Sequence, residues 1–587
     1  MSEDNKLEKA LKDSERIAVI GSPSSTTQLA IDILGSAAHK KLVGELSLFS
    51  FTQDGRKNYA MGQITEVELR NVWHEDPTMR SLIRERGRVD PVSERQDTHL
   101  GEMTVSAVFQ EKNSKYQPSM LGTIPPTGTS ISIVTDDVLD ALLESQRNEL
   151  FYLGNVYGSS PKLPLWFKHF GLGERGAGEA YHLGVFGKTG SGKSVLSKMI
   201  LTGYARHKEL GIFIIDPQGE FSKDLSGSTT GNFKLPLKAI LEGLGRELLV
   251  CKVKDLVLDT FDLFEKILYE SDFFQKLSMP GGENRRIASQ ELIEKLRGKV
   301  KLSELHIRES FDAAWKIIGE GTYQTIVYKS TDSRERFNNM YISADKDGIY
   351  SQIWKPVSNL FNTSRPNGVS INSLIAKAVL PGTKRPIVIV DLSHASAING
   401  SEEAKVIWND SIQATVIKRF LDMIKVNAEK VFKEDTLLNS LVIIDEAHRL
   451  APSGETDNEQ HAGLKRSLVD AARTTRKYGL GWMFISQTLA SLDKEIWGQM
   501  GVYFFGFGLS AGTEYRTLQE IVGGNSTALK LYQTFRHPQS AFDADSKEYP
   551  FMTYGPVSPL SFAGTPLFLS AFTSPERFTK ENGLKTR

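Results

Sequence analysis

The sequence is poor in cysteine, in net charge and in long apolar runs. Its single cysteine, Cys251, excludes an internal disulfide and suits the cytosol, so we expect a cytoplasmic protein. Lysine plus arginine and aspartate plus glutamate both number 71, so no overall charge attracts nucleic acid. No apolar run approaches the ~20 residues of a membrane span, and the charged first residues show no signal peptide. We therefore expect no membrane segment.

Motifs of several enzyme classes are also missing. No serine stands in the G-x-S-x-G pattern of a hydrolase nucleophile, and no histidines show metal-ligand or triad spacing. His394 and His448 are interpreted as lone histidines for this reason. We expect no second catalytic centre beside the one described next.

The sequence contains one strong motif, G-x-x-x-x-G-K-S over residues 187–194, which is the phosphate-binding loop of P-loop nucleoside triphosphatases. Apolar runs before and after it predict the strand and the helix that the motif requires. Its glycines let the backbone curl around phosphates at a helix N-terminus. We expect Lys193 to reach the β- and γ-phosphates of ATP and the Ser194 hydroxyl to bind Mg²⁺. The predicted nucleotide-binding residues are Gly187, Lys188, Thr189, Gly190, Ser191, Gly192, Lys193, Ser194 and Val195.

A second apolar run, residues 441–444, leads directly into Asp445 and Glu446. The strand predicted here delivers Asp445 beside the Mg²⁺ ion, and Glu446 can deprotonate the attacking water. This pair alone is a weak signal, because a strand followed by a helix cap gives the same pattern. Together with the phosphate-binding loop and an intervening strand, it indicates a P-loop ATPase with an additional strand and a catalytic glutamate.

Two further groups of polar residues are candidates for the same site. Gln487 ends the next predicted strand and can contact both the γ-phosphate and the water, or it can be a simple capping amide. Arg473 and Arg476 close the helix that we expect to begin after Glu446, so they can reach a neighbouring subunit's nucleotide. The alternative for these arginines, and the one we prefer for Lys477, is that they complement the helix C-terminus.

Carboxylates also follow the other predicted strands of the core. Asp216, Glu220 and Asp391 are expected at the sheet edge where ligands bind in open α/β proteins. Asp216 and Glu220 are candidate Mg²⁺ ligands together with Ser194 and Asp445. Hydrogen bonding to loop amides is an equally good interpretation for the three carboxylates.

The pattern of apolar, polar and glycine residues along the chain predicts several domains. Short alternating strands over 1–145, with a helical interruption near 77–94, suggest a small barrel or sandwich that serves in assembly. A glycine-rich connector is expected over 146–181. Continuous apolar runs in 182–251 and 381–555 indicate an α/β core with buried parallel strands. Amphipathic helices over 252–380 suggest an insertion, and 556–587 is expected to strap across a neighbouring surface.

In this order, the segments resemble the HerA branch of the HerA/FtsK ATPases. The β-rich N-terminal region carries the resemblance together with residues 187–194, 215–221, 386–392, 445–448, 473–479 and 486–487. The resemblance implies a RecA-like core, an N-terminal β-barrel of the type shared with ATP synthase, and a homo-hexameric ring. It also implies translocation of double-stranded DNA and an effector docked on the barrel face. That effector is typically a NurA-type nuclease, or a sirtuin-like protein or nuclease in phage-defence pairs.

A ring would also explain how a neutral chain handles DNA, because six copies of a modest basic loop can line one channel. One candidate loop is residues 221–238, with Lys223, Lys234 and Lys238. The segment after Glu446 is less suited, because its acidic residues would repel phosphate, namely Glu455, Asp457 and Glu459.

The sequence leaves three hypotheses for function. The leading one is an ATP-driven helicase or translocase that acts on duplex DNA with an effector, in antiviral defence or DNA end processing. The alternative is an ATP-gated structural ring that switches a nuclease or a sirtuin-like NADase with little translocation. A coupling ATPase of conjugation or secretion is less favoured, since no docking segment for a membrane is evident. The lack of FtsK-type membrane and DNA-recognition segments argues against chromosome segregation, and the long insertion over 252–380 leaves the DNA path and the partner open.

Overall fold

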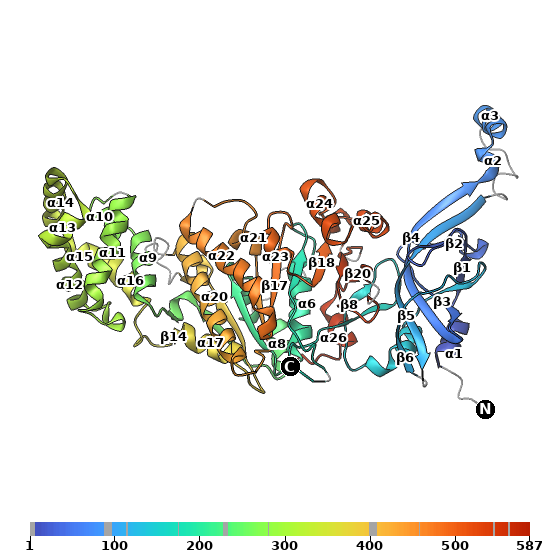
Figure 1. Ribbon diagram of the computed structural model, residues 1–587, viewed down its shortest axis with the longest axis horizontal. Coiled ribbons are helices and arrows are strands. Elements are labelled where there is room, and N and C mark those ends of the chain that lie inside the picture. Colours follow the sequence, from blue (N-terminus) through green and yellow to red (C-terminus); the bar gives the residue numbers. More distant parts are fainter. Residues whose placement is uncertain are drawn as a thin grey trace.

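The computed structural model describes residues 6–86, 97–112, 115–173, 175–226, 233–279, 281–397, 408–456, 458–543, 546–561 and 564–586. The molecule is elongated, with a β-barrel at one end, an α/β core in the middle and a helical insertion at the other end (Figure 1). No helix within these ranges combines the length and the apolar character that crossing a bilayer requires. Of the sequence-based expectations, residues 87–94 of the helical interruption, 227–232 of the basic loop and Asp457 lie outside the described residues.

The N-terminal region is a closed antiparallel barrel, which decides between the barrel and the sandwich. Its strands follow the order β2-β1-β7-β3-β4-β5, and β5 pairs again with β2. Alternating apolar residues of these strands point inward, because successive side chains in a strand face opposite sides. The strands are β1 (Arg16–Ile20), β2 (Leu29–Ile33), β3 (Leu46–Gln53), β4 (Arg56–Asn71), β5 (Asp97–Lys112) and β7 (Ser130–Ile133).

The barrel carries an arm and two flanking helices. Strands β4 and β5 are longer than the others and continue beyond the barrel as a two-stranded ribbon, with α2 (Val72–Glu75) and α3 (Pro77–Arg86) at its tip (Figure 1). At the opposite side, α1 (Lys6–Asp13) contacts α5 (Asp136–Leu142), and β6 (Lys115–Ser119) pairs with β5.

The core is an 11-stranded sheet whose order is β12-β15-β11-β16-β17-β10-β18-β19-β20-β8-β9. From β12 to β18 all neighbours are parallel, and most of these strands are buried along their whole length, as their continuous apolar runs predict. Strand β17 lies between β16 and β10, which is the position expected for the additional strand. These strands are β10 (Leu183–Phe186), β11 (Gly211–Asp216), β12 (Leu248–Lys252), β15 (Ile387–Asp391), β16 (Ser440–Ile444), β17 (Leu480–Ser486) and β18 (Val502–Gly506).

The antiparallel side of the sheet differs from the expected connector and strap. Residues 146–181 supply β8 (Leu150–Val156) and β9 (Lys162–Trp166), and the tail supplies β20 (Leu567–Ala571) between β19 (Pro550–Tyr554) and β8. The tail therefore completes the sheet of its own subunit. The glycine and proline content of these segments obscured the strands, although proline is tolerated at a sheet edge such as β9.

Helices fill the region between β12 and β15. They pack through an aromatic core in which Phe264, Phe311 and Trp354 are fully buried. Helix α17 (Ile371–Val379) contacts β11 and thereby joins the insertion to the sheet. The other main helices are α9 (Phe261–Glu270), α11 (Glu283–Arg297), α12 (Arg308–Gly319), α13 (Gly321–Val327) and α14 (Thr331–Ser343).

Candidate nucleotide-binding site

The phosphate-binding loop joins β10 to α6 (Lys193–Ala205). Gly192, the residue before this helix, has a φ of 88°, a left-handed conformation that glycine adopts without strain. A side chain at this position would also collide with Tyr549, because an added Cβ would lie 2.7 Å from its Cδ1 atom. The loop thus presents the N-terminus of a 13-residue helix, where free N–H groups and the helix dipole favour an anion.

A cavity of about 530 Å³ lies against the loop. Its volume is in the range of small-molecule and cofactor sites. The structure brings most of the predicted site residues to its wall, namely Thr189, Gly190, Gly192, Lys193, Ser194, Val195, Glu220, Asp445, Glu446 and Gln487. Gly187, Lys188 and Ser191 belong to the same loop but do not line the cavity. The Lys188 carbonyl accepts a hydrogen bond from Lys193 Nζ at 3.1 Å, and burial lowers the pKa of Lys193.

Three side chains connect the loop to the two strand ends beside it. Thr189 Oγ1 donates to Gln487 Oε1 at 3.1 Å, and Gln487 Nε2 donates to Glu446 Oε1 at 2.9 Å. Gln487 directly follows β17 and Glu446 closely follows β16, so the additional strand brings the amide next to the carboxylate. This contact places the Gln487 amide and the Glu446 carboxylate at the edge of the sheet where the γ-phosphate of a bound ATP would lie. Such a pair can orient and deprotonate a water molecule.

Glu446 has an unusual backbone conformation. Its φ and ψ are 51° and 41°, in the left-handed region that costs a non-glycine residue roughly 1 kcal/mol or more. The turn that it makes leads into α21 (Ala447–Leu450) and aims its side chain back at the cavity. Strain of this kind is often found at functional positions.

His448 is a neighbour of Glu446 that sequence reasoning did not place at the site. Its Nδ1 atom lies 3.4 Å from Glu446 Oε2 and 3.1 Å from the Ser486 hydroxyl at the end of β17. Burial lowers the pKa of His448. The available signal was the position of His448 two residues after Glu446, because the turn after β16 brings such a residue back to the same edge of the sheet.

Asp445 follows β16 and is buried among other carboxylates. Its Oδ1 atom accepts the Glu446 N–H at 2.9 Å, whereas Oδ2 is buried and has no hydrogen-bond partner among the described residues. Burial, together with Glu220, Glu446 and Asp216, raises the pKa of Asp445 to about 7. An unpartnered carboxylate oxygen in an acidic surrounding fits a divalent cation. The residues present are therefore compatible with Mg²⁺ held by Asp445 and Ser194.

The other predicted carboxylates separate into two groups. Both oxygens of Asp216 are engaged by its own loop, which donates from Gly219 N, Glu220 N, Ser222 N and Ser222 Oγ at 2.7–3.0 Å. Asp391 likewise accepts from Ser393 N and Oγ. These contacts favour the structural interpretation for both residues. Glu220 lines the cavity and pairs with Lys198 at 3.3 Å, so it stays a candidate.

The structure does not bring Arg473 and Arg476 to the cavity of their own chain. The expected helix is divided into α21 and α22 (Glu459–Thr474), and both arginines precede β17. They lie at the amino edge of the parallel sheet, where the Ala472 carbonyl contacts His182 at the start of β10. Arg473 pairs with Glu495 at 2.9 Å and Arg476 lies 3.9 Å from Glu179, in exposed contacts that stabilise little.

One wall of the cavity comes from residues near the end of the chain that no motif marked. Lys547, Tyr549 and Phe572 line it, together with Phe233. Strands β19 and β20 bring these residues to the loop, so only the tertiary pairing reveals them. Their rings give an apolar surface suited to a nucleotide base.

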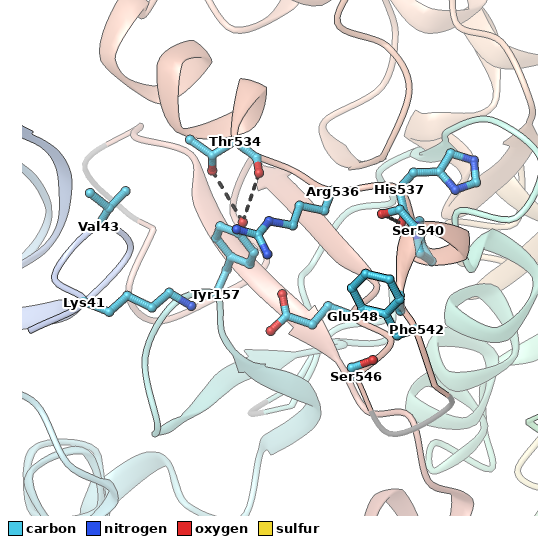
Figure 2. Close-up of a pocket in the computed structure, with 12 residues that line it drawn as sticks. Lys41, Val43, Tyr157, Thr534, Arg536, His537, Ser540, Phe542, Ser546 and Glu548 are labelled. Carbon is cyan, nitrogen blue, oxygen red and sulfur yellow. Dashed lines mark hydrogen bonds between the residues drawn. The ribbon is translucent and has the colours of Figure 1, made fainter.

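A second cavity, of about 650 Å³, lies between the barrel and the core (Figure 2). Lys41 and Val43 of the barrel face Tyr157 and the described residues of the segment 534–548, namely 534–543 and 546–548, and Tyr157 Oη donates to the Thr534 carbonyl at 3.4 Å. No predicted site residue lines this cavity. The segment also reaches the nucleotide cavity through Lys547, so it touches both the barrel and the candidate site.

Comparison with known proteins identifies the central part of the chain. Residues 180–424 match the family model described as the central domain of the helicase HerA. A search of curated proteins gave no match. The match includes the phosphate-binding loop and the insertion, and it ends before Asp445.

Solved structures with a similar arrangement include three ATPases of low sequence identity. The genome-packaging NTPase B204 of Sulfolobus turreted icosahedral virus 2 is 11% identical over 67% of this chain and 98% of its own, with a TM-score of 0.28. VirB4 of Thermoanaerobacter pseudethanolicus is 13% identical over 73% and 97%, with a TM-score of 0.36. The bacterial conjugative coupling protein TrwB is 10% identical over 75% and 92%, with a TM-score of 0.36. This chain is a P-loop ATPase, and its residues 180–424 match the family model of the HerA central domain.

Proposed function

We propose that this ATPase forms a homo-hexameric ring that translocates along or unwinds double-stranded DNA and works with a nuclease or another effector. The setting that suits such a pair is antiviral defence or the processing of DNA ends. The observation that carries the proposal is the continuous contact from Thr189 through Gln487 to Glu446. It connects the phosphate-binding loop to a carboxylate that can activate water, which is what a motor needs beyond nucleotide binding.

In this proposal Glu446 accepts a proton from the water that attacks the γ-phosphate of ATP, while Gln487 orients the water. Lys193 stabilises the negative charge on the transferred phosphoryl group, and the bond to the ADP oxygen breaks. A Mg²⁺ ion held through Ser194 and Asp445 would neutralise part of the phosphate charge. Tyr549 and Phe572 are proposed to contact the base.

The exposed position of the arginines supports a ring. Arg473 and Arg476 lie at the edge of the sheet opposite to their own site, so a nucleotide that they contact would belong to a neighbouring subunit. Arginine is suited to the spreading charge of phosphoryl transfer and contributes roughly 10³–10⁵-fold to the rate where it does so. Hydrolysis would then require two copies of the chain.

The barrel end supports a docking place for the effector. The ribbon of β4 and β5 and the helix α2 at its tip carry exposed apolar side chains beyond the barrel, with exposed fractions of 63% for Leu69, 70% for Val72 and 45% for Trp73. Exposed apolar residues grouped in this way are typical of interaction surfaces. The proposed occupant is a NurA-type or other nuclease, or a sirtuin-like protein.

The proposal is tested by ATP turnover with and without duplex DNA over a salt series. We expect DNA to stimulate turnover, and the DNA concentration needed should rise with salt because phosphate contacts release counterions. Turnover that DNA does not change would favour the alternative, an ATP-gated ring that assembles and switches its effector. Absence of ATP turnover in a homogeneous hexamer would contradict both.

A further inference from the structure

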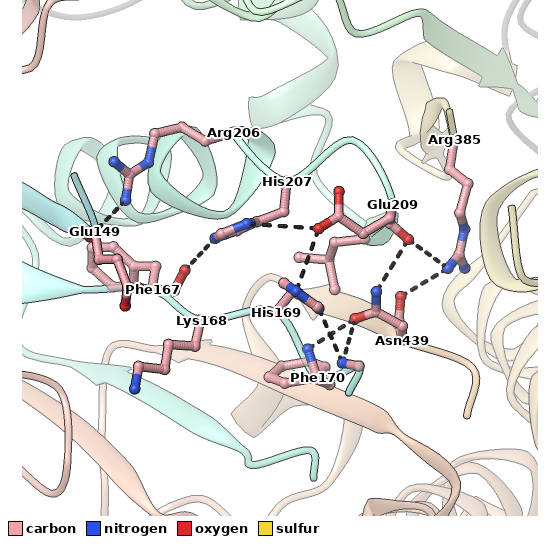
Figure 3. A network of polar contacts seen from close by, with 12 residues as sticks. Glu149, Phe167, Lys168, His169, Phe170, Arg206, His207, Glu209, Arg385 and Asn439 are labelled. Carbon is pink, nitrogen blue, oxygen red and sulfur yellow. Dashed lines mark hydrogen bonds and ion pairs between the residues drawn. The ribbon is translucent and has the colours of Figure 1, made fainter. Parts of the chain in front are cut away.

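A second cluster of chemically active side chains lies at the amino edge of the core sheet, away from the nucleotide cavity (Figure 3). His169 lies between β9 and β10, and His207 and Glu209 lie in the turn between α6 and β11. One possible ligand atom of each residue lies within 4.8 Å of the other two, and Glu209 Oε1 is 3.4 Å from His169 Nε2 and 4.0 Å from His207 Nδ1. The three residues come from two separate segments, so the fold assembles the cluster.

The orientation of His207 is fixed by its backbone surroundings. Its Nε2 atom donates to the Phe167 carbonyl at 2.6 Å, which leaves Nδ1 with a lone pair directed towards Glu209. Nδ1 and Glu209 Oε1 are 4.0 Å apart, which is too long for a hydrogen bond. Two electron-rich atoms thus face each other without a proton between them. A carbonyl on the far nitrogen is the usual partner of a metal-binding histidine.

His169 completes the cluster from the other segment. Its Nε2 atom lies 3.4 Å from Glu209 Oε1, and its Nδ1 atom accepts the Gly171 N–H at 3.1 Å. Gly171 N–H also donates to Asn439 Oδ1 at 3.1 Å. Cation binding through Nε2 requires the proton of His169 to move to Nδ1. The ring must then turn away from the Gly171 N–H, which keeps Asn439 Oδ1 as its acceptor.

The turn that carries His207 and Glu209 is held from behind by buried arginines. Arg246 donates to the His207 carbonyl at 2.6 Å and to the Leu210 carbonyl at 2.8 Å. Arg385 donates to the Glu209 carbonyl at 3.0 Å (Figure 3). These contacts fix the backbone of the turn, so the ligand atoms are positioned before a ligand arrives.

We propose that His169, His207 and Glu209 bind one Zn²⁺ ion, with water as the fourth ligand. Two imidazoles and a carboxylate are ligands that zinc prefers, and tetrahedral bonds of ~2.0–2.1 Å place ligand atoms ~3.3–3.4 Å apart. The His169–Glu209 distance already has this value, and small rotations of the side chains bring His207 to it. The Glu209 side chain is 45% exposed, which leaves the ion accessible from solvent. Bound zinc would join the segment before β10 to the end of α6.

Zinc binding is tested on the full, untagged chain after treatment with a chelator and its removal. ZnCl₂ is titrated in competition with a chromogenic zinc chelator, and bound metal is counted by mass spectrometry. We expect one zinc per chain and a higher melting temperature with zinc. Glu209→Gln and His207→Ala should each weaken binding by at least about 10-fold. Glu209→Gln changes an exposed side chain, so it tests the site even where His207→Ala does not fold.

His39→Ala, which removes an exposed histidine of the barrel, is the matched control and should bind zinc as the unchanged chain does. Cobalt in place of zinc should give the visible absorption of a tetrahedral site. Zinc held equally well by the Glu209→Gln and His207→Ala chains would overturn the proposal. So would an unchanged chain that retains no zinc.

Discussion

At the scale of single residues, Glu446 is the position on which hydrolysis is proposed to depend. We expect Glu446→Gln to bind ATP with little change and to lower turnover by roughly 10²–10⁴-fold, because the amide cannot accept the proton. Single-turnover hydrolysis and equilibrium binding of ATP measure the two effects separately. Glu434→Gln, an exposed change on the same core, is the control. Rapid turnover in Glu446→Gln would move the role of base to another residue.

Lys193 is expected to act on binding and chemistry together. Lys193→Ala removes the ammonium group from the loop, and we expect it to abolish ATP hydrolysis because the charge of the transferred group is no longer stabilised. Lys208 lies outside the cavity, so Lys208→Ala is the control and should leave ATP turnover unchanged. Turnover close to that of the unchanged chain in Lys193→Ala would exclude this loop as the site.

His182 predicts a pH dependence of stability. Its Nε2 atom donates to the Ala472 carbonyl, Nδ1 accepts the Trp482 N–H, and burial lowers the pKa of His182 to about 4. The unfolded chain takes up the proton near pH 6.5, whereas the folded chain does not until about pH 4. The free energy of unfolding should therefore fall as pH drops through this window, by up to ~1.4 kcal/mol per pH unit.

Urea unfolding at several pH values measures this effect. The free energy of unfolding should depend less steeply on pH in His182→Gln than in the unchanged chain. His39→Gln, which changes an exposed side chain, should show the same dependence on pH as the unchanged chain. Equal slopes in all three proteins would show that His182 does not titrate as described.

The sequence predicted the residues whose chemistry follows from a local pattern. The cavity wall includes Lys193, Asp445, Glu446 and Gln487 because each directly follows a strand or begins a helix that periodicity reveals. It could not place His448 beside Glu446, where a turn brings it, or Tyr549 at the cavity, where the pairing of β19 brings it. It also could not show that the two oxygens of Asp216 are used by neighbouring amides.

At the scale of elements, helix α22 would connect the nucleotide sites of two neighbouring subunits in the proposed ring. We expect subunits with Arg473→Ala to be nearly inactive alone, and mixtures with Glu446→Gln subunits to regain some turnover. The rescue would occur where an intact arginine meets an intact glutamate across an interface. Lys477→Ala should stay active alone, since that side chain is interpreted as complementing the helix end. No rescue at any mixing ratio would contradict an arginine supplied by a neighbour.

Strand β20 lies inside the sheet, so the end of the chain should be essential for folding. A chain that stops after Ser561 loses β20, which leaves one edge of β19 and one edge of β8 unpaired and separates β8 and β9 from the rest of the sheet. Each buried Leu or Phe of this strand contributes ~1.5–3 kcal/mol, and their sum is comparable with the ~5–15 kcal/mol that stabilises a domain.

We expect that chain to be insoluble or unfolded by circular dichroism. A chain that stops after Thr573 keeps β20, lacks only α26 (Pro575–Glu581) and the last residues, and should fold with a lower melting temperature. A folded, active protein ending at Ser561 would contradict the described sheet. Periodicity predicted the parallel strands, but the tail strand is short and follows a segment rich in proline and serine, which the pattern could not distinguish from a loop.

At the scale of the whole molecule, the account connects a barrel, an ATPase core and a helical insertion. The barrel end carries the exposed apolar ribbon, and the segment 534–548 touches both the barrel and the nucleotide cavity. Nucleotide state could thus be transmitted towards a partner on the barrel. Co-expression with the protein encoded by the neighbouring gene tests the docking surface.

For this test we expect Leu69→Asp with Trp73→Asp to lose the complex and to keep ATP turnover, because neither residue lines the cavity and α2 lies far from α6 (Figure 1). Arg84→Asp at the tip of the ribbon is a charge-changing control. A complex that survives the double change would place the partner elsewhere.

The measurement that tests the central claim most directly is displacement of the third strand from a triplex on duplex DNA. A hexamer that moves along the duplex should release the strand when ATP is present, and the Glu446→Gln protein should bind the same DNA and release nothing. If the unchanged protein hydrolyses ATP in the presence of the duplex and leaves the third strand in place, it is not a translocating motor and the account is wrong.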